Sequence, residues 1–98
     1  MKIIWSPLSL ERIVDISENI SEDKPGASIK WIESVFSSVE RLAKFPKSGR
    51  VVPEINRYDI REILPGSYRI VYRIEDKSIS VLTVRHGKQL LSKEDIIE

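Results

Sequence analysis

Cysteine is missing from the 98-residue sequence, which contains one histidine and one methionine. Its absence excludes a disulfide framework, thiolate zinc sites and cysteine nucleophiles. Long apolar runs are missing too: no stretch of about 18 apolar residues could span a membrane, and residues 1–7 hold no apolar run of signal-peptide length. We therefore expect a cytoplasmic protein that needs no membrane, metal or cofactor.

The charges nearly balance, with 16 Lys and Arg against 15 Asp and Glu and a net charge of +1. Their distribution is uneven: residues 1–40 hold four basic and seven acidic side chains, and residues 41–98 hold twelve and eight. Residues 41–74 are the most basic, with eight against three. This asymmetry predicts that the second half faces an acidic partner, nucleic acid or protein. The alternative is ordinary variation in a small charged protein.

The content of 41% hydrophobic and 32% charged residues is typical of a globular chain, and residues 1–98 suffice for one domain. Apolar residues at intervals of three and four predict two helices in the first half. The first follows Ser6, a favoured N-cap, with Pro7 at the first helical position, and extends to about Ile20. The second begins near Pro25 and ends before Pro46, which cannot continue a helix.

Segments rich in β-branched and aromatic residues predict four strands: Lys2 to Trp5, Asp59 to Leu64, Tyr68 to Ile74, and Ser78 to His86. Leu64-Pro65-Gly66-Ser67 is typical of a type II turn. Alternation in the third strand places Arg69 and Arg73 on the face opposite to its tyrosines. The order β-α-α-β-β-β predicts an α+β fold, in which a helical hairpin packs on a C-terminal antiparallel meander. Residues 90–98 form a short amphipathic tail.

Three motifs, in order along the chain, resemble those of the RelE/ParE superfamily of toxins. Phe45 to Arg50 followed by Pro53-Glu54 is similar to the superfamily's segment after the second helix. Ile60 to Leu64 followed by Tyr68 to Ile74 is similar to its core strands, and Ile79 to Lys88 to its last strand and the turn after it. The resemblance implies a type II toxin that is neutralised by a cognate antitoxin wrapped around its surface.

Superfamily members that resemble RelE cleave mRNA in the ribosomal A site. The transcript's own 2′-OH is the nucleophile, so the reaction requires a base, cations and an acid. For such an enzyme, the resemblance implies that Arg69 contacts the scissile phosphate and that His86 is the general acid. It implies Glu54 as the base and places Arg61 where a catalytic lysine stands. The chain also departs from this pattern, because Gln89 replaces an expected arginine, and the Lys-x-Lys pair and the C-terminal tyrosine are absent.

Four further cations are candidates for binding the target or the antitoxin: Arg50, Arg73, Arg85 and Lys88. Each candidate also has a purely structural interpretation. In that interpretation the strand arginines form a solvated face, and His86 is a hydrogen-bonded residue at a strand end. Glu54 is then a solvated loop carboxylate, and Arg50 braces its loop.

Two functions follow from the resemblance. Members that resemble ParE poison DNA gyrase through protein contacts and need no catalytic residues, whereas RelE-like members are ribosome-dependent mRNA endoribonucleases. Binding to ribosomal RNA is driven by counterion release and favours strong basicity, and a net charge of +1 is low for that. We therefore favour gyrase over the ribosome with its mRNA as the target. A toxin that has lost its activity and only binds its antitoxin is a third alternative.

Overall fold

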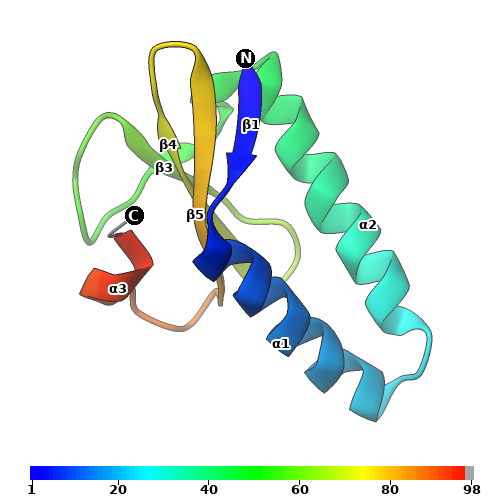
Figure 1. The fold of residues 1–98 in the computed structure, drawn as a ribbon. Coiled ribbons are helices and arrows are strands. Elements are labelled where there is room, and N and C mark those ends of the chain that lie inside the picture. The colour runs from blue at the N-terminus through cyan, green and yellow to red at the C-terminus, as the bar shows by residue number, and fades with distance from the viewer. Residues whose placement is uncertain (97–98) are drawn as a thin grey trace.

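A computed structural model of the protein describes residues 1–96. Its elements (Figure 1) are β1 (Lys2–Trp5), α1 (Pro7–Asp23), α2 (Ala27–Glu40), two 3₁₀ turns (Arg41–Ala43 and Pro46–Ser48), β2 (Arg50–Val51), β3 (Ile60–Ile63), β4 (Tyr68–Ile74), β5 (Ser78–His86) and α3 (Lys93–Ile96). The predicted α+β fold is confirmed, with the short β2 added before β3. The predicted tail contains α3, and its last two residues lie outside the described part. Among residues 1–96, no helix is both long enough and apolar enough to cross a membrane.

The start of α1 is held by Ser6, as the sequence predicts. The Ser6 Oγ accepts a hydrogen bond of 3.0 Å from the N–H of Ser9, which has no partner inside the helix. Pro7 stands at the start of the helix, where its missing N–H would have no helical partner anyway. The Ser6 hydroxyl also donates to the Leu82 carbonyl at 2.8 Å, so the cap ties α1 to β5.

The connection between α1 and α2 differs from the prediction by a few residues. α1 continues to Asp23, because the polar residues after Ile20 are compatible with a helix. α2 begins at Ala27 rather than near Pro25, since Gly26 adopts a left-handed backbone with φ of 90°. The two helices form the predicted hairpin, and Figure 1 shows it along one side of the sheet.

The strands form one mixed sheet in the order β1-β5-β4-β3-β2. β3, β4 and β5 are the predicted antiparallel meander. β1 runs parallel to β5, with Lys2 opposite Ser78 and Trp5 opposite Val81, so the first and last strands are neighbours. Parallel neighbours need a long crossover, which the helices and the other strands supply. β2 pairs antiparallel with β3 at the other edge.

The turn between β3 and β4 lies one residue later than predicted. The N–H of Tyr68 donates to the Pro65 carbonyl at 3.3 Å, which makes Gly66 the second residue of the turn. Gly66 has a φ of 60°. Positive φ at the third position would indicate type II, whereas positive φ at the second is typical of the primed turns that match the twist of a hairpin. The predicted type II turn at 64–67 is therefore corrected to a primed turn at 65–68.

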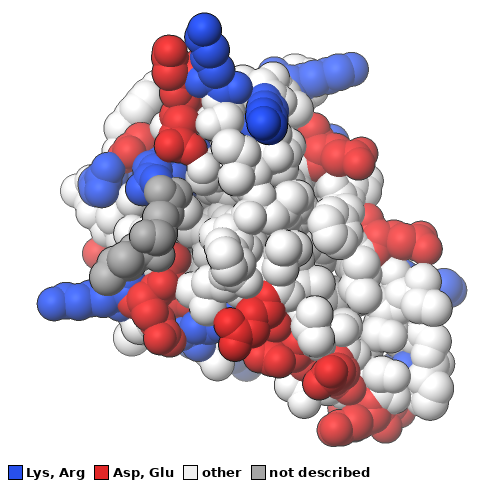
Figure 2. Space-filling model, in the orientation of Figure 1, with Lys and Arg blue, Asp and Glu red and all other residues white. Residues whose placement is uncertain are grey.

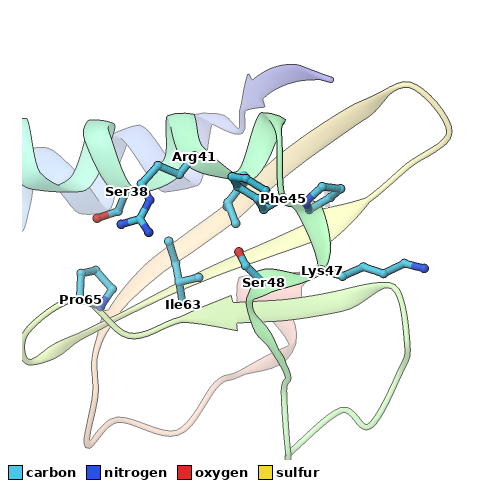
Figure 3. Close-up of a pocket in the computed structure, with 9 residues that line it drawn as sticks. Ser38, Arg41, Phe45, Lys47, Ser48, Ile63 and Pro65 are labelled. Carbon is cyan, nitrogen blue, oxygen red and sulfur yellow. The ribbon is translucent and has the colours of Figure 1, made fainter.

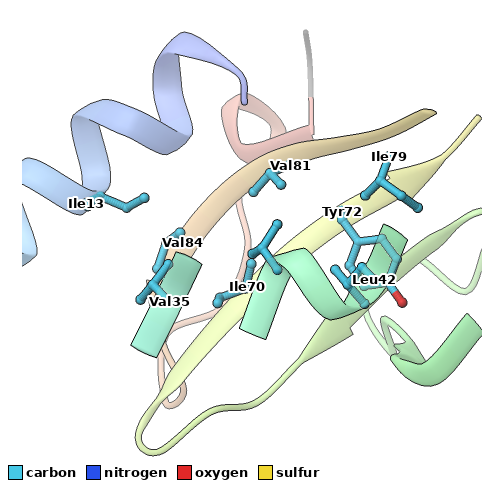
Figure 4. Close-up of a cluster of buried hydrophobic side chains, with 9 residues drawn as sticks. Ile13, Val35, Leu42, Ile70, Tyr72, Ile79, Val81 and Val84 are labelled. Carbon is cyan, nitrogen blue, oxygen red and sulfur yellow. The ribbon is translucent and has the colours of Figure 1, made fainter. Parts of the chain in front are cut away.

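One face of the sheet, here called the helix side, packs against the helical hairpin. Its buried core (Figure 4) comprises Ile13, Val35, Val39, Leu42, Ile70, Tyr72, Ile79, Val81 and Val84. The buried Tyr72 hydroxyl donates to the Pro46 carbonyl at 2.6 Å and accepts from the Gly49 N–H at 3.0 Å. The core therefore also positions the 3₁₀ turn that precedes β2.

The opposite face, here called the tail side, is covered as well, which the sequence analysis did not predict. A second apolar cluster lies there: Val52, Ile60, Val71 and Leu82, covered by Ile55, Leu91 and Ile96. Figure 1 shows α3 across the sheet from α1 and α2. Arg69 and Val71 of β4 are buried on this face. The interpretation of a solvated face at Arg69 is therefore wrong, because the loop after β2 and the tail cover it.

Candidate functional site

Arg69 lies on the tail side of β4 and is 4% exposed. Its Nε donates to the Glu62 carboxylate at 2.6 Å, and its two terminal nitrogens donate to the two carboxylate oxygens of Glu54 at 2.7 and 2.8 Å. Nη1 also donates to the Gln89 carbonyl at 3.0 Å. The guanidinium thus joins β3, the loop after β2 and the tail. Its Nε, Nη1 and Nη2 all donate to protein oxygens, and the planar guanidinium matches the Glu54 carboxylate in a bidentate pair.

The same contacts determine the protonation of Glu54. Its hydrogen bonds with Arg69 lower the pKa of Glu54 to about 2, although burial acts in the opposite direction. The N–H of Leu91 also donates to this carboxylate, at 3.3 Å. Arg69 in turn has a raised pKa, because Glu54 and Glu62 both stabilise its charge. A carboxylate with so low a pKa is a poor proton acceptor at neutral pH.

Arg50 belongs to the same network of charges. Its Nε and Nη2 each lie 2.8 Å from one Glu62 oxygen, so the buried Glu62 is held between Arg50 and Arg69. A buried carboxylate needs such partners, because an unpaired charge in the interior is strongly unfavourable. Arg50 therefore braces β2 against β3, which supports its structural interpretation.

Arg85, the neighbour of Arg69 across β4 and β5, binds the tail. Its Nε and Nη2 donate to Asp95 of α3 at 3.0 Å. Asp95 is fully buried, and it also accepts from Thr83 at 3.0 Å and lies 3.3 Å from Arg12 of α1. Burial opposes its ionisation, but the hydrogen bonds from Arg85 and its neighbours outweigh that effect and lower the pKa of Asp95 to about 2. This ion pair fastens α3 to the sheet.

The remaining strand-end candidates lie near the surface. The Nη2 atom of Arg73 lies 4.0 Å from the Oε2 atom of Glu75. Lys88 is exposed and forms no ion pair within residues 1–96. The exposed His86 accepts a hydrogen bond at Nδ1 from the Lys88 N–H at 3.3 Å, and its ring lies edge-on to Tyr68 at 5.5 Å. The contacts of His86 agree with a hydrogen-bonded residue at a strand end.

Arg61 lies on the helix side of β3, opposite Tyr72. It donates to the carbonyls of Tyr58 at 3.1 Å and of Gly49 at 2.9 Å. Its guanidinium also stacks over the exposed Tyr58 ring at 4.7 Å. Arg61 therefore fastens the 3₁₀ turn and the loop after β2 to the edge of the sheet.

The strand register separates the four candidate catalytic residues. His86 pairs with Tyr68 across β4 and β5. Paired residues point to the same face of the sheet, so His86 shares the face of Tyr68. Successive residues of a strand point to opposite faces, so Arg69, which follows Tyr68, lies on the face opposite to His86. Glu54 is with Arg69 on the tail side, whereas Arg61 is on the helix side. The structure therefore brings Arg69 and Glu54 together in an internal ion pair, and the sheet separates them from His86 and Arg61.

Comparison with known proteins decides the family. The model described as "ParE toxin of type II toxin-antitoxin system, parDE" matches residues 3–91. The chain belongs to the ParE toxin family. A curated relative of this ParE-family toxin, "Putative toxin Y4kP" of Sinorhizobium fredii (strain NBRC 101917 / NGR234), is 31% identical over 93 residues, and the match covers 90% of each protein.

A solved structure shares the fold of the ParE-family toxin. A chain of the "Chromosomal ParDE TA system from P. aeruginosa" matches with a TM-score of 0.76 at 15% identity, over 90% of this chain and 97% of that one. The predicted membership of the RelE/ParE superfamily is confirmed, and the protein is a toxin of the type II toxin-antitoxin class. Among residues 1–96, no three His, Asp or Glu side chains are grouped to hold a metal ion.

The ParE-family toxin also carries a hollow that the sequence analysis did not single out. It lies between the end of α2 and β3 and measures about 720 Å³ (Figure 3). This basic hollow is lined by Ser38, Arg41, Leu42, Phe45, Pro46, Lys47, Ser48, Ile63 and Pro65. A signal was present in the sequence, because residues 41–50 hold four cations and no acid. The apolar part of the lining comes from elements distant in sequence, so only the fold reveals it.

Proposed function

We propose that this ParE-family toxin arrests growth by poisoning DNA gyrase through protein contacts and that a cognate antitoxin silences it. Membership of the ParE family supports a toxin of this kind. The proposal places the toxin in the cytoplasm, where gyrase acts on the chromosome. It assigns the toxin a binding role, for which no cofactor is needed.

One observation carries the choice of gyrase over mRNA: the side chains that a RelE-like ribonuclease needs do not form one site. Metal-independent cleavage of RNA requires a base, an acid and a cation within reach of the same phosphate. Here the donors of Arg69 bind Glu54 and Glu62, and His86 lies on the other face of the sheet. The low net charge supports the same choice, because ribosomal RNA attracts strongly basic proteins.

A gyrase cleavage assay with purified toxin, purified gyrase and supercoiled plasmid tests the proposal. Poisoning traps gyrase on cut DNA, so detergent and protease should release linear plasmid in an amount that rises with toxin concentration. Plasmid incubated with toxin alone should stay supercoiled, which controls for a contaminating nuclease. If micromolar toxin releases no linear plasmid and, in a parallel assay on relaxed plasmid, leaves supercoiling by gyrase untouched, the proposal is contradicted.

The ribonuclease alternative gives a different result in cells. Primer extension on cellular mRNA after induction detects cuts within translated codons if the toxin acts at the ribosome. Such cuts, with no effect on gyrase, would overturn the proposal in favour of an mRNA endoribonuclease. Normal growth during expression without antitoxin would instead indicate a protein that retains only antitoxin binding.

A further inference from the structure

We propose that the free edge of β1 is the interface through which two copies of this toxin form a symmetric dimer. In this dimer the two β1 strands pair antiparallel about a twofold axis at Ile4, so that the sheets of the two copies become continuous. Its formation requires no property of gyrase or of an antitoxin, so it goes beyond the proposed function.

The outer edge of β1 has backbone groups that face no other strand. β1 lies at the end of the sheet, beside β5 and no other strand of residues 1–96. Figure 1 shows it in front of β5, with no element drawn before it. The N–H groups of Lys2 and Ser6 donate toward β5, to carbonyls at 3.2 and 3.0 Å. Because successive backbone groups point to opposite sides of a strand, those of Ile3 and Trp5 point to the open edge, where another strand can pair with them.

An antiparallel pairing centred on Ile4 joins these groups to one another. Ile3 of each copy then lies opposite Trp5 of the other, and the two residues exchange N–H···O bonds. A pairing centred on Ile3 would instead require the amino group of Met1, which already donates to the Ala43 carbonyl at 3.0 Å. Centring on Ile4 therefore uses the groups that are available.

The same pairing buries apolar side chains that the single chain leaves exposed. Ile4 is 44% exposed, and it would face its own counterpart in a non-hydrogen-bonded pair, in which side chains approach most closely. The exposed Leu10 and Val14 lie one turn apart on the same side of α1, which follows β1 directly. Figure 2 shows mainly uncharged side chains over the part of the molecule that β1 occupies in Figure 1. Monomeric proteins usually protect such an edge with charge, so this one is suited to pairing.

Positive charge predominates at the start of β1, here called the basic end. The amino terminus lies there with the exposed Lys2, and the exposed Lys77 precedes the residue that pairs with Lys2 in β5. The same turn holds the acids Glu75 and Asp76, and the Nη2 atom of Arg73 lies 4.0 Å from Glu75. Counted with the amino terminus, the cations of the basic end outnumber its acids.

Negative charge predominates at the other end of β1, where α1 follows; this is here called the acidic end. The first half of α1 carries the exposed Glu11 and Asp15. Its one cation, Arg12, lies 3.1 Å from Glu94 and 3.3 Å from Asp95. Figure 2 shows acidic side chains along the region of α1. The acidic end therefore presents carboxylates to a partner.

The twofold axis at Ile4 brings opposite charges together twice. Antiparallel pairing places the basic end of each copy beside the acidic end of the other. A partner of uniform charge would be attracted at one end of β1 and repelled at the other. A second copy of the chain therefore fits this edge better than a uniformly charged partner.

A disulfide tests the pairing directly, because the chain contains no cysteine. Ile4→Cys places two thiols across the axis, where a non-hydrogen-bonded pair brings the Cα atoms to about 4.5 Å, within disulfide range. Ile29→Cys, at an exposed isoleucine of α2, is the control for random collisions. With oxidised glutathione as the oxidant, a non-reducing gel should show a covalent dimer for Ile4→Cys and a monomer for Ile29→Cys. Equal cross-linking of the two variants, or none in either, would contradict the pairing.

Sedimentation of the purified toxin over a range of concentrations measures the dimerisation Kd, which we expect on the order of micromolar for so short a strand. Ile4→Lys should raise this Kd about tenfold or more, because like charges then face each other across the axis. Ile29→Lys, the matched control, should stay within about threefold of the unchanged toxin. The melting temperature of each variant shows whether the exposed substitutions leave the fold intact.

A charge exchange tests the orientation of the two copies. Lys2→Glu with Lys77→Glu reverses the basic end, and Glu11→Lys with Asp15→Lys reverses the acidic end. Each double variant alone should dimerise about tenfold or more weakly at low salt, and less so at high salt, because salt screens exposed charges. An equimolar mixture should regain the affinity of the unchanged toxin, since both ends of the mixed dimer then pair opposite charges.

Three outcomes would overturn the dimer. The first is a toxin that sediments as a monomer up to its solubility limit. The second is a mixture of the double variants that associates no more tightly than either variant alone. The third is a monomeric toxin whose affinity for the product of the neighbouring reading frame is lost in Ile4→Lys but kept in Ile29→Lys, which would assign the edge to that partner.

Discussion

At the scale of single residues, the cations of this toxin fall into two groups with different environments. Arg50, Arg69 and Arg85 donate to buried or partly buried carboxylates and hold segments of the chain together. Arg41 and Lys47 lie on the rim of the basic hollow and form no ion pair within residues 1–96. The first group is therefore expected to affect stability when it is changed, and the second to affect binding.

Arg69→Ala should destabilise the fold. The change leaves the buried Glu62 with one cationic partner instead of two and frees the Glu54 loop. Breaking a buried ion pair costs about 3–5 kcal/mol, and urea titrations should show a loss of that order in the free energy of unfolding. Arg57→Ala, which removes an exposed pair with Asp59, is the control and should cost less than about 1 kcal/mol. Equal costs for the two variants would contradict the structural role of Arg69.

Glu54 and Asp95 should make the fold sensitive to acid. Their pKa values are about 2 in the folded protein, below the ordinary 4.5 and 3.8. Carboxyl groups whose pKa is lowered by folding stabilise the fold above their unfolded pKa, and that contribution is lost as the pH falls through the folded pKa. The urea concentration at the midpoint of unfolding should therefore decrease as the pH is lowered from about 5 to about 2. Glu54→Gln or Asp95→Asn should make the urea midpoint depend less on pH. If the urea midpoint of the unchanged protein does not change with pH, the two carboxyl groups do not have the lowered pKa values assigned to them.

At the scale of elements, the approach of the 3₁₀ turn to β3 and β4 depends on Gly49. A Cβ at this position would lie 2.5 Å from the Tyr72 hydroxyl and 2.6 Å from the Glu62 carbonyl oxygen. Gly49→Ala should therefore lower the free energy of unfolding by about 1–3 kcal/mol, the usual cost of overpacking. Ser48→Ala, at the exposed neighbour, should change it by less than about 0.5 kcal/mol. If the two variants unfold at the same melting temperature, the backbone accommodates the added methyl group without a loss of stability, and the prediction is wrong.

The positions of most elements could be predicted because they depend on local patterns. β4 and β5 have the bounds that alternation predicts, and the Ser6 cap and the helical hairpin are where the sequence places them. The parallel pairing of β1 with β5 and the covering of the tail side could not be predicted in this way. Alternation separates the two faces of a strand, but only a distant loop or tail decides whether the second face meets water.

The candidate site could be predicted as a set of residue types but not as a geometry. Arg69 and Glu54 are indeed adjacent, yet the sequence does not show that the carboxylate fully engages the guanidinium. The separation of Arg69 from His86 depends on the register in which Tyr68 opposes His86. That register is set by the turn after β4 and by the irregularity between Val71 and Tyr72, which composition does not specify.

At the scale of the whole molecule, opposite charges lie in different places and nearly cancel in the total. α1 carries the exposed acids Glu11, Asp15, Glu18 and Glu22. Figure 2 shows acidic side chains along the part of the molecule that α1 occupies in Figure 1. The basic hollow lies elsewhere, between the end of α2 and β3. A partner with uneven charge is therefore oriented before contact, although the net charge is only +1.

The toxin should induce the SOS response in cells, because trapped gyrase leaves broken DNA. Expression without antitoxin should raise an SOS reporter before growth stops. His86→Ala should do the same, since the proposal assigns this exposed residue no catalytic role. Reporter fluorescence and optical density measure the two effects. Growth arrest that disappears in the His86→Ala variant, with a silent reporter in both strains, would favour the ribonuclease.

The order in which the strands are synthesised differs from the order in which they lie in the sheet. β1 emerges from the ribosome well before β5, which is its neighbour in the sheet, and Arg12 of α1 emerges well before its partner Asp95. Until those last residues leave the exit tunnel, the nascent chain has an edge without a partner and an unfastened first helix. A folded toxin therefore exists only after β5 and Asp95 have been synthesised and have left the exit tunnel, and a protector already in the cell has that interval in which to meet the chain.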